Sequence, residues 1–277
     1  MPAPTFLCIG AQKCGTTWLA SAVAQHPEVG TGRKKELHFF DQRARYERGL
    51  GWYERQFRVG PRTRAIGEFT PNYWRTVGAA TPTTFLGAAD RVAAAYPDLQ
   101  LLLCLRDPVE RAVSAYFHNI KAGRLSPSVP FADALRERPG LRDFGRYGSQ
   151  LDAWLAHYPL ERFLVLVYEE DIRPDDAKPE ALRRTFEHLG VDPGFSPGDT
   201  SVQRNVRLSH FEMRLRHASQ EERRAMERLP ASERDSPRWT ITIPDADRRA
   251  LAEDYRPEVA RLEELLGRRM PWRLTGS

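Results

Sequence analysis

The chain has 277 residues, of which 41% are hydrophobic and 29% charged, a balance typical of a folded globular protein and not of a disordered or fibrous one. Its 42 Lys and Arg against 37 Asp and Glu leave a net charge of +5, which fits the binding of small anions but not of nucleic acid, for which a basic stripe is expected. Three cysteines make no disulfide framework, and no apolar run reaches the roughly 18 to 20 residues of a membrane span, so we expect a cytoplasmic protein.

The strands and helices expected from the sequence alternate along most of the chain. Short apolar runs predict buried strands at residues 5–10, 64–69, 100–105 and 162–168. Amphipathic patterns predict helices at residues 16–25, 79–96, 107–121, 147–157 and 176–189, and charged helices at 209–229 and 244–266. This alternation indicates an α/β fold, with a parallel sheet flanked by helices on both faces and a helical C-terminal part. Because no Gly/Ser linker divides the chain, we expect residues 1–277 to form a single domain.

The first strand runs directly into a glycine-flanked turn with the sequence Gly10-Ala-Gln-Lys13-Cys-Gly15-Thr16-Thr17, after which a helix is expected to begin. A strand, a tight turn and a helix N-terminus in this order present backbone amides to an anion. The standard phosphate loop places a lysine directly after the second glycine, followed by a metal-binding hydroxyl. Here Thr16 takes the lysine position and Lys13 lies inside the loop, so the lysine–hydroxyl arrangement of ATPases is absent. Alone, the pattern also fits a tight turn with a solvated lysine.

A second motif follows the strand at residues 100–105 and begins with Arg106-Asp107-Pro108. Arg106 is at the carboxyl end of a strand, where open α/β sheets bind ligands. Ser114 is a little over two helical turns further on and can face the same side. An arginine and a hydroxyl so placed suit a second phosphate, although Arg106 and Asp107 could also serve only in capping and ion pairing.

Together these stretches resemble the sulfotransferases that use 3′-phosphoadenosine 5′-phosphosulfate (PAPS), and most closely their heparan-sulfate and bacterial carbohydrate-type branch. Further stretches extend the resemblance: Lys35-Glu36-Leu-His38-Phe-Phe40, Gly51-Trp-Tyr53, Glu68-Phe-Thr-Pro-Asn-Tyr73, and Gly145-Arg-Tyr147 with its following helix. The resemblance therefore runs from about residue 5 to residue 170.

The resemblance implies a P-loop-like fold, PAPS as the sulfo donor, no metal, and transfer by in-line displacement. It implies that Lys13 stabilises the leaving phosphate and that Glu36 is the general base, with His38 as second choice or orienting partner. Because His38 is two residues past Glu36, an extended segment would place both on one side. The residues implied to bind the donor are Gln12, Lys13, Cys14, Gly15, Thr16, Thr17, Trp18, Arg106, Ser114, Arg204 and Arg207.

Two positions depart from the family pattern. Phe69 stands where some glycan-modifying members have a lysine, and the segment of Arg204 and Arg207 keeps the charge but lacks the glycine of a closing loop. We interpret Glu68 as structural. The expected acceptor is a hydroxyl or amine of a carbohydrate or small natural product, and the oligomeric state cannot be predicted. The alternatives are a P-loop nucleotide kinase or NTPase and a non-catalytic nucleotide-binding module.

Overall fold

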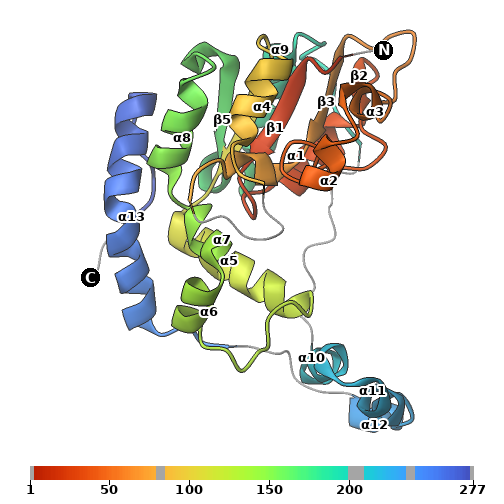
Figure 1. Ribbon diagram of the computed structural model, residues 1–277, viewed down its shortest axis with the longest axis vertical. Coiled ribbons are helices and arrows are strands. Elements are labelled where there is room, and N and C mark those ends of the chain that lie inside the picture. Colours follow the sequence, from red (N-terminus) through yellow and green to blue (C-terminus); the bar gives the residue numbers. More distant parts are fainter. Residues whose placement is uncertain (1–2, 79–84, 199–208, 235–240, 275–277) are drawn as a thin grey trace.

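The structure is a computed structural model that describes residues 3–78, 85–198, 209–234 and 241–274. At its centre is a parallel sheet of five strands in the order β2-β3-β1-β4-β5 (Figure 1). The strands are β1 (Phe6–Gly10), β2 (Val29–Thr31), β3 (Ala65–Phe69), β4 (Gln100–Leu105) and β5 (Phe163–Val167). Four of them were predicted, because a strand buried on both faces is a continuous apolar run. The sequence did not predict β2, which has only three residues.

The helices form two layers on the sheet and a third group beyond it. Within the described residues they are α1 (Thr16–Val23), α2 (Arg43–Tyr46), α3 (Leu50–Glu54), α4 (Ala88–Ala95), α5 (Pro108–Lys121), α6 (Phe131–Glu137), α7 (Pro139–Asp143), α8 (Tyr147–Leu155), α9 (Lys178–Leu189), α10 (His210–His217), α11 (Gln220–Glu227), α12 (Ala231–Arg234) and α13 (Asp245–Leu266). Short turns occur at η1 (Pro71–Trp74), η2 (Leu160–Arg162) and the π-helical η3 (Tyr168–Ile172). None of the described helices is both long and apolar enough to cross a membrane.

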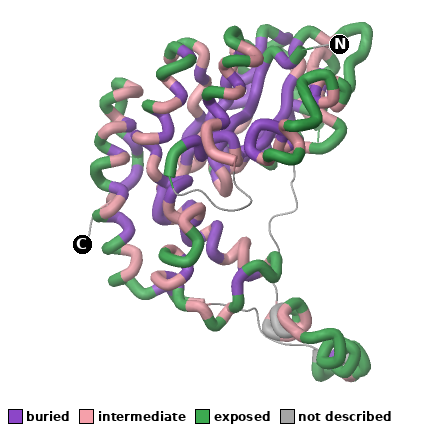
Figure 2. Tube along the Cα trace, in the orientation of Figure 1, coloured by how far each residue is buried: buried purple, intermediate pink, exposed green. Residues whose placement is uncertain are grey.

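Helices cover both faces of the sheet, as predicted. On one face α1 packs against α9 and β3, and α9 also contacts β4 and β5. On the other face lie α4 and α8, with α13 packed along α8 (Figure 1). The predicted α/β fold with a helical C-terminal part is therefore confirmed. Helices α10 to α12 lie apart from the sheet beyond the end of α5, and much of their surface is exposed (Figure 2).

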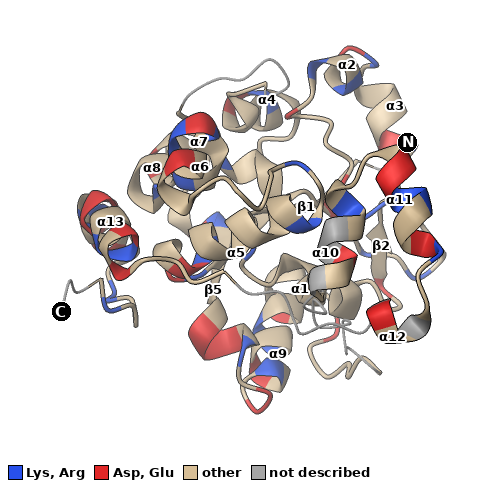
Figure 3. Ribbon diagram, turned by 90° about the horizontal axis from the view of Figure 1, so that it is seen from below, with Lys and Arg blue, Asp and Glu red and all other residues tan. Residues whose placement is uncertain are grey.

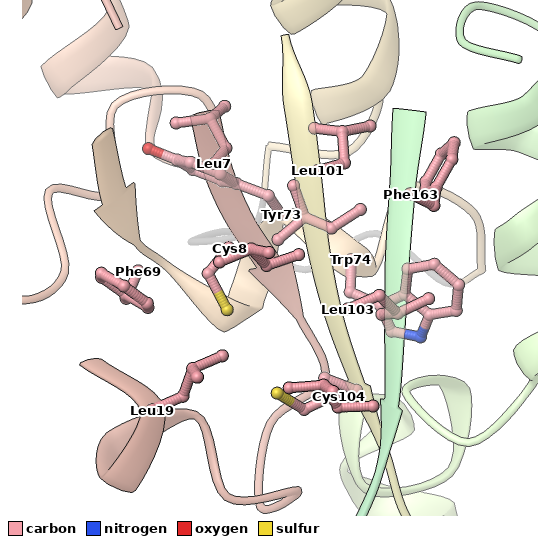
Figure 4. Packing of buried hydrophobic residues seen from close by; sticks show 14 of the residues in the cluster. Leu7, Cys8, Leu19, Phe69, Tyr73, Trp74, Leu101, Leu103, Cys104 and Phe163 are labelled. Carbon is pink, nitrogen blue, oxygen red and sulfur yellow. The ribbon is translucent and has the colours of Figure 1, made fainter. Parts of the chain in front are cut away.

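The hydrophobic core follows the alternation of side chains along the strands. Cys8 and Cys104 point with Leu19 of α1 to one side of the sheet, whereas Leu7 and Leu103 point to the other (Figure 4). All five side chains are fully buried. The two cysteines therefore serve as core residues on neighbouring strands.

Helix boundaries agree with the sequence where a cap is encoded locally. Asp107 caps α5, because its Oδ1 accepts from the amides of Val109 and Glu110 at 2.9 and 3.0 Å, and Pro108 occupies the first helical position. Two predicted helices were wrong in extent. The one expected from residue 79 begins only at Ala88, after Gly87 in a left-handed conformation with φ of 77°, while residues 79–84 lie outside the described residues.

The helix expected at residues 209–229 is two helices, α10 and α11, because the chain turns at Ala218 and Ser219. Ser219 caps α11 by accepting from the amide of Glu222, whose carboxylate accepts from the Ser219 amide. This reciprocal capping box is visible in the sequence as Ser followed three residues later by Glu, and it was overlooked.

Candidate functional site

A large cleft of about 1800 Å³ opens at the carboxyl ends of β1, β4 and β5. Figure 3 shows the molecule from this side, with α5 in front of the sheet and blue Lys and Arg segments beside β1 and α5. The predicted residues that line the cleft are Gln12, Lys13, Gly15, Thr16, Thr17, Trp18, Glu36, Arg106 and Ser114. They meet because neighbouring parallel strands end at one edge of the sheet, so the loops that follow them share one space.

The loop after β1 has the geometry of an anion site. Gly15 has a φ of 93°, and a Cβ atom there would lie 2.8 Å from Ile172 Cγ2, so both conformation and space require glycine. Helix α1 begins immediately afterwards at Thr16, so the amides of its first turn point into the cleft region without carbonyl partners from a preceding turn. These amides and the helix dipole favour an anion at this point.

Lys13 is in the same loop, held in a left-handed conformation with φ of 72°. Burial lowers the pKa of its ammonium group, and the positive charges of Arg106 and Lys121 lower it further. Crowded cations in a partly buried cleft repel one another, and an anionic ligand between them would relieve that repulsion.

Arg106 lines the same cleft, and its neighbours hold it in place. Its guanidinium lies 4.9 Å from the ring centroid of Tyr168, and its Nη2 is 3.7 Å from Glu110 Oε2. The buried Nε of Arg106 has no hydrogen-bond partner among the described residues. The backbone is also fixed, because the Tyr147 hydroxyl donates to the Arg106 carbonyl at 2.8 Å. The cleft thus holds an oriented guanidinium whose donors are incompletely used.

The side chain of Cys14, one of the residues predicted to bind the donor, does not line the cleft. Its thiol is fully buried, and Sγ lies 3.7 Å from the Tyr147 hydroxyl. Burial raises the pKa of this thiol to about 12. The prediction of a donor-binding role for Cys14 therefore cannot apply to its side chain, which is buried against Tyr147.

Glu36 lies at the edge of the cleft in a chain of charged groups. Its Oε1 accepts from Lys35 Nζ at 2.7 Å, and its Oε2 is 3.2 Å from His38 Nε2. On its other side His38 contacts Asp41 through Nδ1, 2.9 Å from Oδ2. Burial opposes ionisation of both groups, but the hydrogen bonds outweigh it and set the pKa of Glu36 to about 2 and that of His38 to about 9. Near neutral pH Glu36 is thus a carboxylate and His38 an imidazolium.

The sequence predicted an extended segment with Glu36 and His38 on one side, and this conformation is not observed. His38 has a φ of 52°, so the chain turns at this residue, and the imidazole is not among the groups that line the cleft. The turn nevertheless brings the two side chains into contact. His38 is therefore placed as a partner of Glu36 and not as a group facing the cleft.

Sequence reasoning missed three cleft residues that could have been found. Lys35 was noted only as part of a motif. His118 is one helical turn past Ser114 on α5, so it shares the same face. Burial lowers the pKa of His118 to about 4, helped by Lys13 and Arg124. Tyr168 directly follows the carboxyl end of β5, so the rule that identified Arg106 applied to it as well.

Two of the residues predicted to bind the donor cannot be placed in the cleft. Arg204 and Arg207 lie outside the described residues, so their proposed closure over the donor stays a prediction. In the described part of the chain, no three His, Cys, Asp or Glu side chains are grouped so that they could hold a metal ion.

Comparison with known proteins identifies the family of this chain. Residues 3–258 match the family model of the sulfotransferase domain, and the chain belongs to this family. The family expected from the sequence is thereby confirmed. A crystal structure of a sulfotransferase from Alicyclobacillus acidocaldarius is similar over 98% of both chains, with a TM-score of 0.69 and 27% identity.

Two of the similar curated proteins are named as heparan sulfate sulfotransferases. Heparan sulfate glucosamine 3-O-sulfotransferase 6 of Homo sapiens is 35% identical in an alignment of 173 residues that covers 58% of this chain and 45% of that protein. Heparan sulfate glucosamine 3-O-sulfotransferase 3B1 of Mus musculus is 33% identical in an alignment of 201 residues that covers 68% of this chain and 46% of that protein. The chain spans about half the length of these relatives.

Proposed function

We propose that this protein transfers a sulfo group from PAPS to a hydroxyl or amine of a carbohydrate or a small natural product. The observation that carries the proposal is the meeting of two anion-binding elements in one cleft with an ionised glutamate at its edge. Lys13 and the start of α1 form one element, and Arg106 with Ser114 forms the other. Membership of the sulfotransferase family gives the chemistry that such a cleft would perform.

The donor has two separate phosphate groups, which match the two elements. The 5′-phosphosulfate would lie at the loop of Lys13, with the amides of Gly15, Thr16 and Thr17 as donors. The 3′-phosphate would lie at Arg106 and Ser114. Lys13 would then stabilise the negative charge that develops on the leaving phosphate oxygen during displacement. Trp18 also lines the cleft, with Lys178 Nζ 5.8 Å from its ring centroid, and offers an aromatic surface to the donor.

The acceptor must lose a proton as the sulfo group arrives. At neutral pH Glu36 can take that proton because it is ionised, whereas His38 already carries one. This difference favours Glu36 as the general base. His38 would orient the carboxylate, since it contacts Glu36 on one side and Asp41 on the other.

A carbohydrate acceptor is supported by the named substrates of the curated relatives, and the contacts around Glu36 do not separate a hydroxyl from an amine. A nucleotide kinase or NTPase is less consistent with the loop, because Thr16 stands where such enzymes place their phosphate-binding lysine. A single domain over residues 1–277 and a cytoplasmic location stay predictions.

Calorimetry distinguishes the proposal from its alternatives. Titration with 3′-phosphoadenosine 5′-phosphate is expected to show micromolar binding, and titration with ATP and Mg²⁺ much weaker binding. Transfer of radiolabelled sulfate from PAPS to a glycan or extract acceptor would then separate an enzyme from a nucleotide-binding module. Micromolar ATP binding without bisphosphate binding would overturn the proposal.

A further inference from the structure

A buried polar cluster lies behind Glu36 and His38. It consists of Glu68 at the end of β3, Thr70, Tyr73 and, from α3, Tyr53, and we call these four residues the Glu68 cluster. Their exposed fraction does not exceed 1%. None of the four lines the cleft. A carboxylate so deeply buried is costly unless hydrogen bonds compensate it.

The cluster binds the backbone of the segment that carries the proposed base. Four successive amides, those of residues 37 to 40, donate to its side chains. The first donates to Glu68 Oε2 at 2.9 Å and to Thr70 Oγ1 at 3.0 Å, and the second to Thr70 Oγ1 at 3.3 Å. The last two donate to the Tyr73 hydroxyl at 2.9 and 3.4 Å. One of these amides thus binds the Glu68 carboxylate directly, and all four are held by side chains of the cluster.

The hydrogen atoms in the cluster can be assigned by counting. The hydroxyls of Thr70 and Tyr73 each accept from two amides, so each must donate its own hydrogen elsewhere. Both donate to Glu68, at 2.5 and 2.7 Å, and the Tyr53 hydroxyl donates at 2.9 Å. With the Leu37 amide, the carboxylate accepts four hydrogen bonds. Burial raises the pKa of the Glu68 carboxyl, and these four hydrogen bonds act in the opposite direction.

This network fixes a backbone shape that the segment would not adopt readily by itself. The left-handed conformation of His38, with φ of 52°, is unfavourable for a residue other than glycine. The bonds from residues 37 to 40 offset that cost. They hold the turn so that His38 Nε2 reaches Glu36 Oε2 and its Nδ1 reaches Asp41.

We propose that Glu68, together with Thr70 and Tyr73, is a positioning group that holds the turn at residues 37 to 40 and thereby sets the contact between His38 and the base Glu36. The proposal rests on the proposed function insofar as Glu36 takes the acceptor's proton. A merely structural cluster would stabilise the fold without controlling this contact.

Thr70 offers the sharpest test, because its hydroxyl contacts the His38 amide directly. Thr70→Val removes the hydroxyl at nearly constant shape, and Thr70→Ser restores it. Thr185→Val is the matched control: Thr185 is also fully buried, and its hydroxyl donates to the Ala181 carbonyl at 2.7 Å in α9.

The first measurement is an NMR titration of the His38 imidazole, which needs neither donor nor acceptor and stays decisive if no sulfo transfer is found. The carboxylates of Glu36 and Asp41 raise the pKa of His38 to about 9. Loss of the turn loosens both contacts, so in Thr70→Val we expect this pKa to fall by half a unit or more. It should stay unchanged in Thr70→Ser and Thr185→Val. An unchanged pKa in folded Thr70→Val, or an equal fall in Thr185→Val, would overturn the proposal.

The second measurement separates positioning from binding. In Thr70→Val we expect kcat to fall at least tenfold, while the affinity for 3′-phosphoadenosine 5′-phosphate stays within twofold. An equal loss of both would indicate general damage to the cleft and overturn the proposal. If Thr70→Val does not fold, Tyr73→Phe allows the same comparison, with Tyr158→Phe as control because that hydroxyl is bonded to the Tyr96 carbonyl at 2.6 Å.

Discussion

Replacement of Arg106 by alanine tests the assignment of the 3′-phosphate directly. The Arg106 guanidinium lies over the ring of Tyr168, and the Arg106 backbone carbonyl accepts a hydrogen bond from Tyr147. Little ordering of the residue is therefore needed when a phosphate binds. Arg106→Ala removes the charge but leaves the backbone at the carboxyl end of β4 in place. We expect the loss to depend on whether the nucleotide carries a 3′-phosphate.

The magnitude follows from the surroundings of the side chain. Only 20% of the Arg106 side chain is exposed, so solvent screens its charge weakly, while Glu110 at 3.7 Å neutralises part of it. A charge-assisted hydrogen bond contributes about 1.5–3 kcal/mol, and we expect a net loss of about 3 kcal/mol for the variant. This corresponds to about a 100-fold higher Kd for 3′-phosphoadenosine 5′-phosphate. Adenosine 5′-phosphate should lose less than about fivefold, since it makes no 3′-phosphate contact.

Isothermal titration of both nucleotides into wild type and variant measures the difference. Arg183→Ala is the matched control, because Arg183 also lines the cleft but is 46% exposed and already paired with Glu180 and Glu187. It should change neither Kd by more than about threefold. Equal losses for the two nucleotides in Arg106→Ala, or the same selective loss in Arg183→Ala, would refute the assignment.

Three further predictions concern the base, the loop lysine and Tyr147. Glu36→Gln should lower kcat by about 10²–10⁴-fold in initial-rate assays while keeping bisphosphate affinity within a few-fold, and unchanged turnover would show that Glu36 is not the base. The pKa of Lys13 is lowered in the free protein, and a bound anion should raise it, so bisphosphate binding should take up protons at a pH above that lowered pKa. Calorimetry in two buffers of different ionisation enthalpy measures this uptake. Uptake that persists in Lys13→Met would contradict the prediction. Tyr147→Phe removes the hydroxyl that holds the Arg106 carbonyl and should weaken bisphosphate binding by about 3- to 10-fold in the same titration, whereas binding equal to wild type would show that this bond does not position Arg106.

The sequence predicted the parts of the site that local patterns encode. Buried strands are apolar runs, the cap of α5 is an Asp-Pro pair, and parallel strands bring Lys13 and Arg106 to one edge. The residues proposed to bind the two phosphates could therefore be identified without a structure.

Features that depend on contacts between distant residues could not be found in this way. The direction of the Cys14 thiol follows from its neighbour Tyr147, which is 133 residues away. The turn at His38 is held by hydrogen bonds from backbone amides to the hydroxyls of Thr70 and Tyr73, which are more than 30 residues further along the chain. Glu68 was interpreted as structural, but nothing in the sequence indicated that it binds the Leu37 amide beside the proposed base, together with the hydroxyls of Thr70 and Tyr73.

The central place of β1 in the sheet determines when the cleft can form during synthesis. Phe6 pairs with Gly67 and Gln100, and β4 in turn pairs with β5, so the sheet is built from contacts distant in sequence. Such strand pairs form slowly, because the entropy of closing a long loop is lost before the paired strands stabilise each other. The loop of Gly15 is synthesised early, yet its packing partner Ile172 follows about 10 to 30 seconds later at usual rates of translation, and further residues that line the cleft follow Ile172. The phosphate loop is thus among the first parts of the site to be made and among the last to be ordered.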